Sequence, residues 1–351
     1  MNSIFNQLPP PITIEPQMLS WLVLAALAGF VLAMALTPVY TYFAFTYEAW
    51  KRVRQSTTSG EKAPVFHKLH QEKHQRNIPT MAGVVIVVSV AVVTLLFNYD
   101  QAQTLLPLLA LVAAGSVGLV DDLINIRGEG TGVAGLRSRL KFWLILSIAA
   151  GVSVYAFVKL GYVSLAVPFL GQVPLGWGLV PLFILVILAS ANAVNITDGL
   201  DGLAGGLSTI VFGVYSIIAL LQGNMGIAVF CATVVGVMLS YTWFNIYPAR
   251  FFMGDSGSFA LGTTLGVIAL LTDTVLLLPI IGAVFVLEAG SSSIQLLSKR
   301  LRGRKIFHSA PLHHHFEAMG WPETKVTMRF WVLGSVSGTI GLMIAIWGGQ
   351  L

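Results

Sequence analysis

The 351-residue chain has little charge and almost no cysteine. Lys, Arg, Asp and Glu together make up 10% of the residues, against roughly 25% in an ordinary soluble domain, so the composition excludes a soluble enzyme. The single cysteine, Cys231, excludes an intramolecular disulfide framework and a thiolate zinc site. Hydrophobic residues make up 56% of the chain. Several apolar runs approach the ~20 residues that cross a bilayer, which indicates a polytopic membrane protein.

Apolar windows predict ten membrane-spanning helices in one integral membrane domain over residues 1–351. We expect these helices at 18–43, 79–97, 104–120, 142–158, 179–193, 206–221, 226–244, 258–271, 275–298 and 330–347. The longest connections between them are expected near 44–78, 121–141, 194–205, 245–257 and 299–329. The connection at 161–178 has alternating apolar residues followed by Gly171, which predicts a short β-hairpin outside the membrane. The predicted fold class is therefore an all-α polytopic membrane protein with one small hairpin.

Basic residues are unevenly divided between the two sides of this arrangement. Ten helices place both termini on one side, and all but one of the 20 Lys and Arg fall in the odd-numbered connections on the other side. Lys159 is the exception. Because Lys and Arg accumulate in cytoplasmic loops, the odd connections are predicted to be cytoplasmic and both termini external.

Five aspartates gather at predicted cytoplasmic helix ends, namely Asp121, Asp122, Asp198, Asp201 and Asp255. Carboxylates that converge on one face repel one another unless a cation lies among them, so the pattern indicates a divalent metal. Oxygen ligands without any thiolate favour Mg²⁺ or Mn²⁺. The alternative is that these side chains cap helices or remain solvated at helix ends.

The run NAVNITDGLDGLAGG places more oxygen atoms near this predicted site. Asp198 and Asp201 are three residues apart, so on a helix they share a face, which Asn192 and Asn195 continue toward the amino end. We therefore expect amide oxygens and carboxylates to point into one cavity. The glycines that follow leave room for a ligand or backbone to approach closely.

The ninth connection, about 30 residues long, is too long for a passive link and contains APLHHHFEAMGW. Consecutive helical residues lie about 100° apart, so His313, His314 and His315 cannot all bind one ion from a helix, which argues against zinc. Upstream, the connection carries Arg300, Arg302, Arg304 and Lys305. These basic groups suit phosphate oxygens, and the alternative is a loop that binds anionic lipid headgroups.

Two other features carry weaker signals. Glu288 is an ionisable group inside a predicted span, which suggests a pocket or a partner, whereas nearby Ser291 and Gln295 suggest helix packing instead. Phe251 and Phe252 precede Gly254-Asp255 and could stack on a base or anchor the chain at the membrane surface.

Taken together, these motifs resemble the polyprenyl-phosphate N-acetylhexosamine-1-phosphate transferases. The matching sequences cover most of the chain in the expected order and are IPTMAG, GLVDDL, NAVNITDGLDGLAGG, FNIYPARFFMGDSGS, the Glu288 span and PLHHHFEAMGWPETKV. The HHHFE run followed by GW is typical of the phospho-N-acetylmuramoyl-pentapeptide transferase branch. The resemblance implies ten helices with external termini, a place in the inner (cytoplasmic) membrane, an active site on its cytoplasmic face, and Mg²⁺ as cofactor.

The resemblance also implies the reaction and the partners. Undecaprenyl phosphate would react with UDP-MurNAc-pentapeptide to give lipid I and UMP, the first membrane step of peptidoglycan synthesis. A homodimer is usual for the family, and no nucleic acid partner is expected. The alternatives are a related transferase that acts on UDP-N-acetylglucosamine and, in another class, a lipid or ion transporter, which would carry its acidic groups at mid-membrane. The sequence leaves open direct attack by the lipid phosphate and a phosphoryl-enzyme.

Residue roles follow from the matched motifs. By resemblance, Asp121 and Asp122 form the family's aspartate pair, Asp255 is the magnesium ligand and Asn195 a second ligand. Contacts to substrate phosphates are expected from Lys141, His313, His314 and His315. Contacts to the uridine or the rest of the substrate are expected from Thr80, Asn192, Asn195, Asp198, Asp201, Asn245 and Phe252. The chain departs from the family pattern at Ala82, where a glycine is usual, at Gln75 or Arg76, where a lysine is usual, and in the glycine-rich stretch 128–135.

Overall fold

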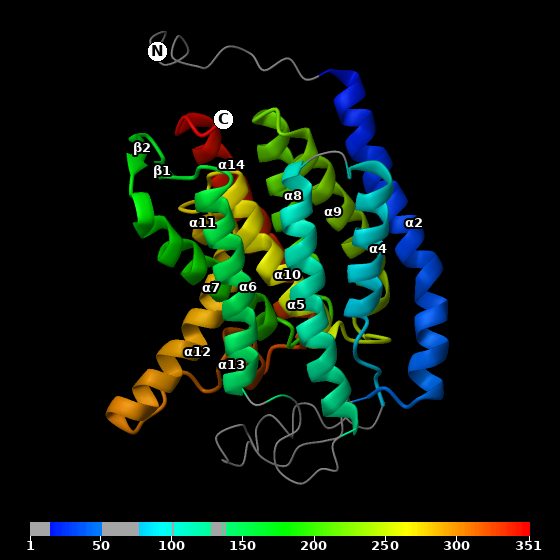
Figure 1. Cartoon of the computed structure of the whole chain (residues 1–351). Coiled ribbons are helices and arrows are strands. Elements are labelled where there is room, and N and C mark those ends of the chain that lie inside the picture. Colours follow the sequence, from blue (N-terminus) through cyan, green and yellow to red (C-terminus); the bar gives the residue numbers. More distant parts are fainter. Residues whose placement is uncertain (1–14, 51–76, 100–101, 128–135, 137) are drawn as a thin grey trace, which may run out of the picture.

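Long helices run from one end of the molecule to the other (Figure 1). The structure is a computed structural model that describes residues 15–50, 77–99, 102–127, 136 and 138–351. Within these ranges, eight helices are long and apolar enough to cross a membrane, and α4 (Gly83–Phe97) is a shorter apolar helix. The eight are α2 (Pro16–Thr46), α5 (Ala102–Arg127), α6 (Ser138–Val158), α7 (Leu179–Thr197), α8 (Leu203–Leu221), α9 (Met225–Asn245), α10 (Gly254–Leu271) and α14 (Glu323–Trp347). The chain is therefore a multi-pass, mostly helical membrane protein, as its composition predicts.

The helix predicted over 275–298 is divided in the structure. A single turn, α11 (Leu278–Ile281), is followed by α12 (Ala283–Arg302). Gly282 separates them with backbone angles of −98° and 30°, outside the helical region. The break turns α12 away from the bundle (Figure 1). The prediction of one continuous helix is wrong here, because apolar composition alone does not reveal a change of helix direction.

The predicted hairpin is confirmed. Strand β1 (Ser164–Val167) pairs antiparallel with β2 (Gly171–Pro174). Gly171 has a φ of +82°, a left-handed conformation that glycine adopts at low cost. The short helix η1 (Gly176–Gly178) then leads into α7. The hairpin lies at the end of the molecule where α14 finishes (Figure 1).

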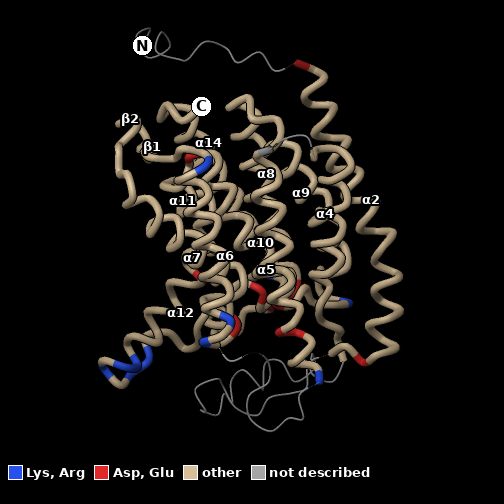
Figure 2. Tube along the Cα trace, viewed as in Figure 1, with Lys and Arg blue, Asp and Glu red and all other residues tan. Residues whose placement is uncertain are grey.

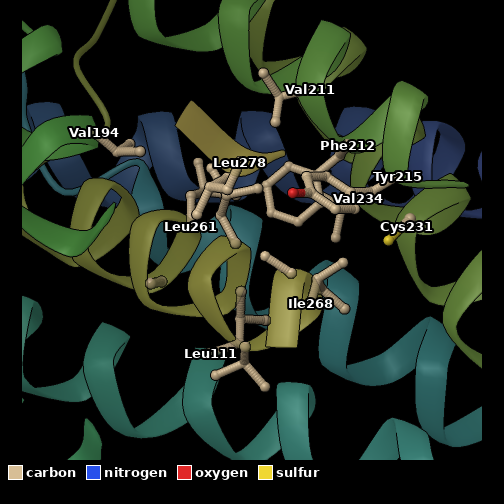
Figure 3. Packing of buried hydrophobic residues seen from close by; sticks show 14 of the residues in the cluster. Leu111, Val194, Val211, Phe212, Tyr215, Cys231, Val234, Leu261, Ile268 and Leu278 are labelled. Atoms are coloured by element: carbon tan, nitrogen blue, oxygen red, sulfur yellow. The ribbon is translucent and has the colours of Figure 1, made fainter. Parts of the chain in front are cut away.

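Helix α10 occupies the middle of the bundle, with most of its residues buried. Small residues allow its neighbours to approach closely, as helix packing in membranes requires. A side chain at Gly262 would lie 2.6 Å from the Ser190 carbonyl oxygen of α7. On its other side, large apolar residues such as Phe212 of α8, Val234 of α9 and Ile268 fill the core (Figure 3). This packing leaves the amino-terminal end of α10 facing the polar end of the molecule.

Charged residues gather at the end where α5 finishes and α10 begins (Figure 2). Lys159 follows α6 and Asp273 follows α10 at the opposite end. The start of α2 and the end of α14 also lie at that opposite end (Figure 1). The distribution of basic residues predicts that the charged end faces the cytoplasm, and this orientation stays a prediction.

Candidate functional site

An acidic cluster forms where α5 crosses the first turn of α10. Asp121 and Asp122 lie near the carboxyl end of α5, and Asp255 is the second residue of α10. One oxygen from each carboxylate can be chosen so that all three lie within 4.8 Å of one another. Asp121 and Asp122 are buried, while the Asp255 side chain keeps 16% of its surface exposed. Three carboxylates this close could hold a metal ion.

Two glycines make this approach possible. A side chain at Gly118 of α5 would lie 2.1 Å from the backbone oxygen of Asp255, closer than real atoms pack. Gly254 has a φ of +72°, and a side chain there would lie 2.4 Å from Oδ2 of Asp122. Glycine at these positions therefore brings the aspartate pair of one helix against the aspartate of another.

Lys141 of α6 joins the cluster. Its Nζ lies 2.9 Å from Asp121 Oδ2 and 2.5 Å from Asp255 Oδ2. Asp121 also accepts hydrogen bonds from the Leu136 backbone NH at 2.7 Å and from the side-chain amide of Asn125 at 2.9 Å. The ammonium thus bridges the aspartates of two different helices. Asn125 belongs to this network although sequence reasoning did not select it; its position one turn after Asp121 on the same helix was the available signal.

The end of α7 contributes Asn195. Its side-chain amide nitrogen donates to Asp255 Oδ1 at 3.3 Å and to Ser258 Oγ at 2.8 Å. Asn192 is exposed on the same helix. The helix ends at Thr197, so Asp198 is its C-cap and Asp201 lies in the following turn. The prediction that Asp198 and Asp201 share a helix face is therefore wrong, because the chain leaves the helix before reaching them.

Asp201 and Asn245 join separate loops. Asp201 Oδ2 accepts a hydrogen bond from the Ala249 backbone NH at 2.9 Å. Asn245 accepts from the Gly202 NH at 2.9 Å and donates to the Phe251 carbonyl at 2.8 Å. Both side chains are buried. In this structure they hold the loop after α7 against the loop before α10, and a direct substrate contact for either stays a prediction.

The IPTMAG segment runs beside the FFMGD segment. Phe252 donates its backbone NH to the Pro79 carbonyl at 2.8 Å and accepts from the Ala82 NH at 3.1 Å. Thr80 is buried, and a side chain at Gly254 would meet both its Oγ1 and Asp122. Phe252 is half-buried. Ala82 is buried in this pairing, whereas the departures at 75–76 and 128–135 lie outside the described residues.

Phe251 and Phe252 take different roles. The Phe251 ring is buried, with its centroid 5.4 Å from Tyr40, 6.1 Å from Tyr241 and 5.6 Å from Phe244. These contacts make Phe251 a packing residue. Phe252 is the more accessible of the two rings, so it remains the candidate for stacking on a base.

The three histidines lie on α13 (Leu312–Ala318) and contact three different partners. His313 Nδ1 lies 2.8 Å from Glu288 Oε2, and its backbone NH donates to the same carboxylate. His314 Nδ1 lies 2.7 Å from Glu317 Oε2, and His315 Nδ1 accepts from the His308 NH at 3.2 Å. The structure therefore agrees with the argument that one ion cannot bind all three. Glu288 is confirmed as an ionisable group with a partner.

Glu317 is a further member of this group that sequence reasoning passed over. It is buried and lies three residues after His314, a spacing that brings two helical side chains together. Burial and then the nearby His313 lower the pKa of His314 to about 4, although Glu317 and Glu288 oppose the change. His314 is therefore a neutral imidazole near pH 7.

The loop after α7 connects the acidic and histidine clusters. Asn195 contacts Asp255, whereas a side chain at Gly199 would lie 2.3 Å from Nε2 of His313. Asp198 lies between these two positions. The acidic cluster with Lys141 lies beside the end of α7, and the His313 imidazole lies against the loop that follows it, an arrangement that can bind a cation beside phosphate groups.

Comparison with known proteins identifies the relatives of this chain. The model for glycosyl transferase family 4 matches residues 104–273. The chain is 38% identical over 337 residues to a phospho-N-acetylmuramoyl-pentapeptide-transferase of Chloroflexus aurantiacus, covering 92% of this chain and 89% of the relative. A protein of the same name from Geobacillus sp. strain WCH70 is 38% identical over 93% of this chain and 98% of its own. Another, from Bacillus thuringiensis, is 37% identical over the same shares.

Proposed function

Because the chain belongs to the phospho-N-acetylmuramoyl-pentapeptide-transferase family, which makes lipid I in peptidoglycan synthesis, we propose the following reaction for it. Phospho-N-acetylmuramoyl-pentapeptide passes from UDP-MurNAc-pentapeptide to undecaprenyl phosphate, yielding lipid I and UMP. The observation that carries the proposal is the meeting of Asp121, Asp122 and Asp255 with Lys141 at one end of the bundle.

Mg²⁺ is the cofactor that we assign to the acidic cluster. Three neighbouring carboxylates, two of them paired with one ammonium, leave negative charge in a partly buried place, and oxygen donors suit Mg²⁺. Asp255 is the ligand we assign first, because it is the most exposed of the three carboxylates. Asn195 directs its amide nitrogen at Asp255, so its role as a second ligand stays a prediction. When bound, the ion would neutralise pyrophosphate charge during transfer.

The protein's own groups position the substrates. Lys141 supplies positive charge at the acidic cluster, where the pyrophosphate would lie. His313 reaches the loop after α7 from the other side, because a side chain at Gly199 would lie 2.3 Å from its Nε2. Neutral His314 donates from Nδ1 to the Glu317 carboxylate 2.7 Å away, which leaves its Nε2 as an acceptor, so a phosphate contact of His314 requires the protonated ring and stays a prediction. Asp198 and Phe252 lie on the two loops that Asn245 joins, which supports a uridine site between these loops.

Direct attack by the lipid phosphate is the route we favour. Asp121 accepts hydrogen bonds on both of its oxygens, from Leu136, Asn125 and Lys141, which lowers its availability as a nucleophile. A phosphate monoester has a second pKa near 6, so it is already largely ionised at neutral pH. Stoichiometric UMP release in the absence of undecaprenyl phosphate would instead indicate a phosphoryl-enzyme.

We further propose that the charged end of the bundle faces the cytoplasm, in the inner membrane. Support comes from the concentration of basic residues at that end, since such residues remain on the cytoplasmic side. A homodimer, as is usual in the family, is also proposed, and we expect no nucleic acid partner.

The full-length protein in detergent tests the reaction. It should release UMP from UDP-MurNAc-pentapeptide only when undecaprenyl phosphate and Mg²⁺ are both present. UDP-N-acetylglucosamine is the matched control and should give no UMP. Equal or faster turnover of the control substrate would contradict the assignment of the muramoyl-pentapeptide.

A further inference from the structure

The far end of α12 takes no part in the reaction proposed above. Along most of this helix, polar side chains are buried against the protein and apolar side chains are exposed. Val284 and Phe285 are buried at the start of the helix, and the buried residues after them are polar and comprise Glu288, Ser291, Gln295 and Ser298. Six apolar residues are instead between 48% and 72% exposed, namely Val286, Leu287, Ile294, Leu296, Leu297 and Leu301.

The spacing of these six apolar residues places them on one broad stripe along α12, away from the buried polar residues. An apolar stripe of this length is unfavourable in water and suits the acyl chains of a membrane. Helix α12 is absent from the eight helices of the described residues that could cross a membrane, and it leans outward from the bundle (Figure 1). It therefore has the character of an amphipathic helix at the membrane surface.

The chain beyond α12 folds back on the helix and is held there. Gly303 turns the chain with a φ of +64°. Gln295 Oε1 then accepts from the backbone NH groups of Ile306 and Phe307 at 3.0 and 3.1 Å, and its Nε2 donates to the Phe307 carbonyl at 3.0 Å. Ser298 donates to the Arg304 carbonyl at 2.9 Å. The turn at 299–305 is thus a built part of the fold, which we name the α12 tip.

The α12 tip is strongly basic. Five of its seven residues are Lys299, Arg300, Arg302, Arg304 and Lys305. The last four of these are exposed, and Figure 2 shows the basic cluster at the outer end of α12. Each Lys or Arg near an anionic membrane surface adds to the attraction between protein and membrane. The charge of the tip therefore complements a layer of phosphate groups.

We propose that the α12 tip binds the phosphate groups of anionic phospholipids in the membrane that surrounds the protein. The apolar stripe selects a lipid over a soluble phosphate, because Leu301, 72% exposed, lies between Arg300 and Arg302. Apolar contact and positive charge thus meet where acyl chains give way to headgroups. The bound lipid holds the outer end of the segment that leads to α13 and its histidines. This binding is independent of which sugar the enzyme transfers.

The test compares the full-length protein with a variant carrying Arg300→Gln, Arg302→Gln, Arg304→Gln and Lys305→Gln. Both are titrated in detergent with phosphatidylglycerol or phosphatidylcholine while the thermal midpoint is followed. We expect phosphatidylglycerol to stabilise the unchanged protein, and the variant to need at least about tenfold more of it for half the effect. Phosphatidylcholine should not distinguish them. Lys159→Gln, at the opposite end, is the matched control and should behave as the unchanged protein.

Equal phosphatidylglycerol dependence in the two proteins would overturn the proposal. So would an equal stabilisation by inorganic phosphate, because the ligand would then be a free anion. If the fourfold variant does not fold, Arg300→Gln with Arg302→Gln should still require about threefold more phosphatidylglycerol. An unchanged requirement in that double variant would also overturn it.

Discussion

The two ends of the bundle both carry polar networks, but they differ in charge. At the end with the hairpin, neutral groups predominate, as where Gln222 donates to the Thr272 and Gln350 carbonyls at 2.8 Å and Gln350 donates to the Ala166 carbonyl at 3.1 Å. At the other end, three carboxylates lie close together and Lys141 contacts two of them, Asp121 and Asp255. A neutral network is complete once its hydrogen bonds form, whereas crowded carboxylates retain charge that a cation can neutralise. We therefore expect the first arrangement to serve assembly and the second to serve chemistry.

Among the predicted variants, Asp255→Asn should cause the largest loss in the rate of UMP release. It removes a charge from the acidic cluster, so UMP release should fall by roughly 10²–10³-fold and lose its dependence on Mg²⁺. The matched control is Asp273→Asn at the other end. There the carboxylate accepts from the Ala166 NH at 3.1 Å and from Gln172 at 2.6 Å, so the rate should hardly change. Equal rates for the two variants would contradict the contrast between the ends.

Gly118→Ala should cause the second-largest loss in the rate of UMP release. Its methyl group would meet the Asp255 carbonyl oxygen and push α5 away from α10, separating the aspartates. A displacement of about 1 Å can cost about 10²-fold in rate, and we expect that loss in the UMP assay. Gly151→Ala in α6 is the control, because a side chain there has open space. Full activity in Gly118→Ala would show that the close crossing is unnecessary.

Glu323→Ala tests the support of the loop after α7. Glu323 accepts from the Asp201 NH at 2.6 Å, while Thr327 donates to the Asp201 carbonyl and Trp331 to that of Gly202. Losing this charge-assisted bond should raise the KM for the UDP substrate about tenfold with little change in kcat. Glu323→Gln keeps an oxygen acceptor and should restore most of the affinity. A fall in kcat alone would argue against this positioning role.

The smallest predicted effect is the change in protein stability with pH. His314 has a pKa of about 4 in the folded protein, below the ordinary value of 6.5. The unfolded chain therefore binds the extra proton first, and stability should decrease as the pH falls from 6.5 toward 4. We expect the thermal midpoint to drop by roughly a few degrees over this range. His314→Gln should flatten that dependence, and an identical slope would show that other groups cause it.

Local patterns were enough to predict much of the fold. Apolar windows indicated the helices, and the Gly171 turn indicated the hairpin, because both depend on residues close in sequence. The boundaries were less accurate: Asp121 and Asp255 lie inside helices, where connections were expected. Hydropathy marks where apolar residues end, whereas a helix continues for as long as its backbone hydrogen bonds do.

Within the site, Asp121, Asp122, Asp255 and the histidine run stood out because acidic and histidine clusters are rare in such an apolar chain. Their partners were harder to predict. Glu317 could have been found from its spacing to His314, but Glu323 and Gly118 act on residues more than 100 positions away. The inward polar face of α12 likewise depends on a chain reversal that no local pattern reveals.

The sequence by itself determined that this is a polytopic membrane protein, that its charge is concentrated on one side, and which residue types could handle a metal and phosphates. These properties follow from composition and from spacing along the chain. Only the tertiary structure decided which carboxylates meet, which histidine contacts which glutamate, and which aspartates hold loops together. Such pairings depend on how closely helices cross, and that distance is set by glycines and side-chain volumes contributed from distant parts of the chain.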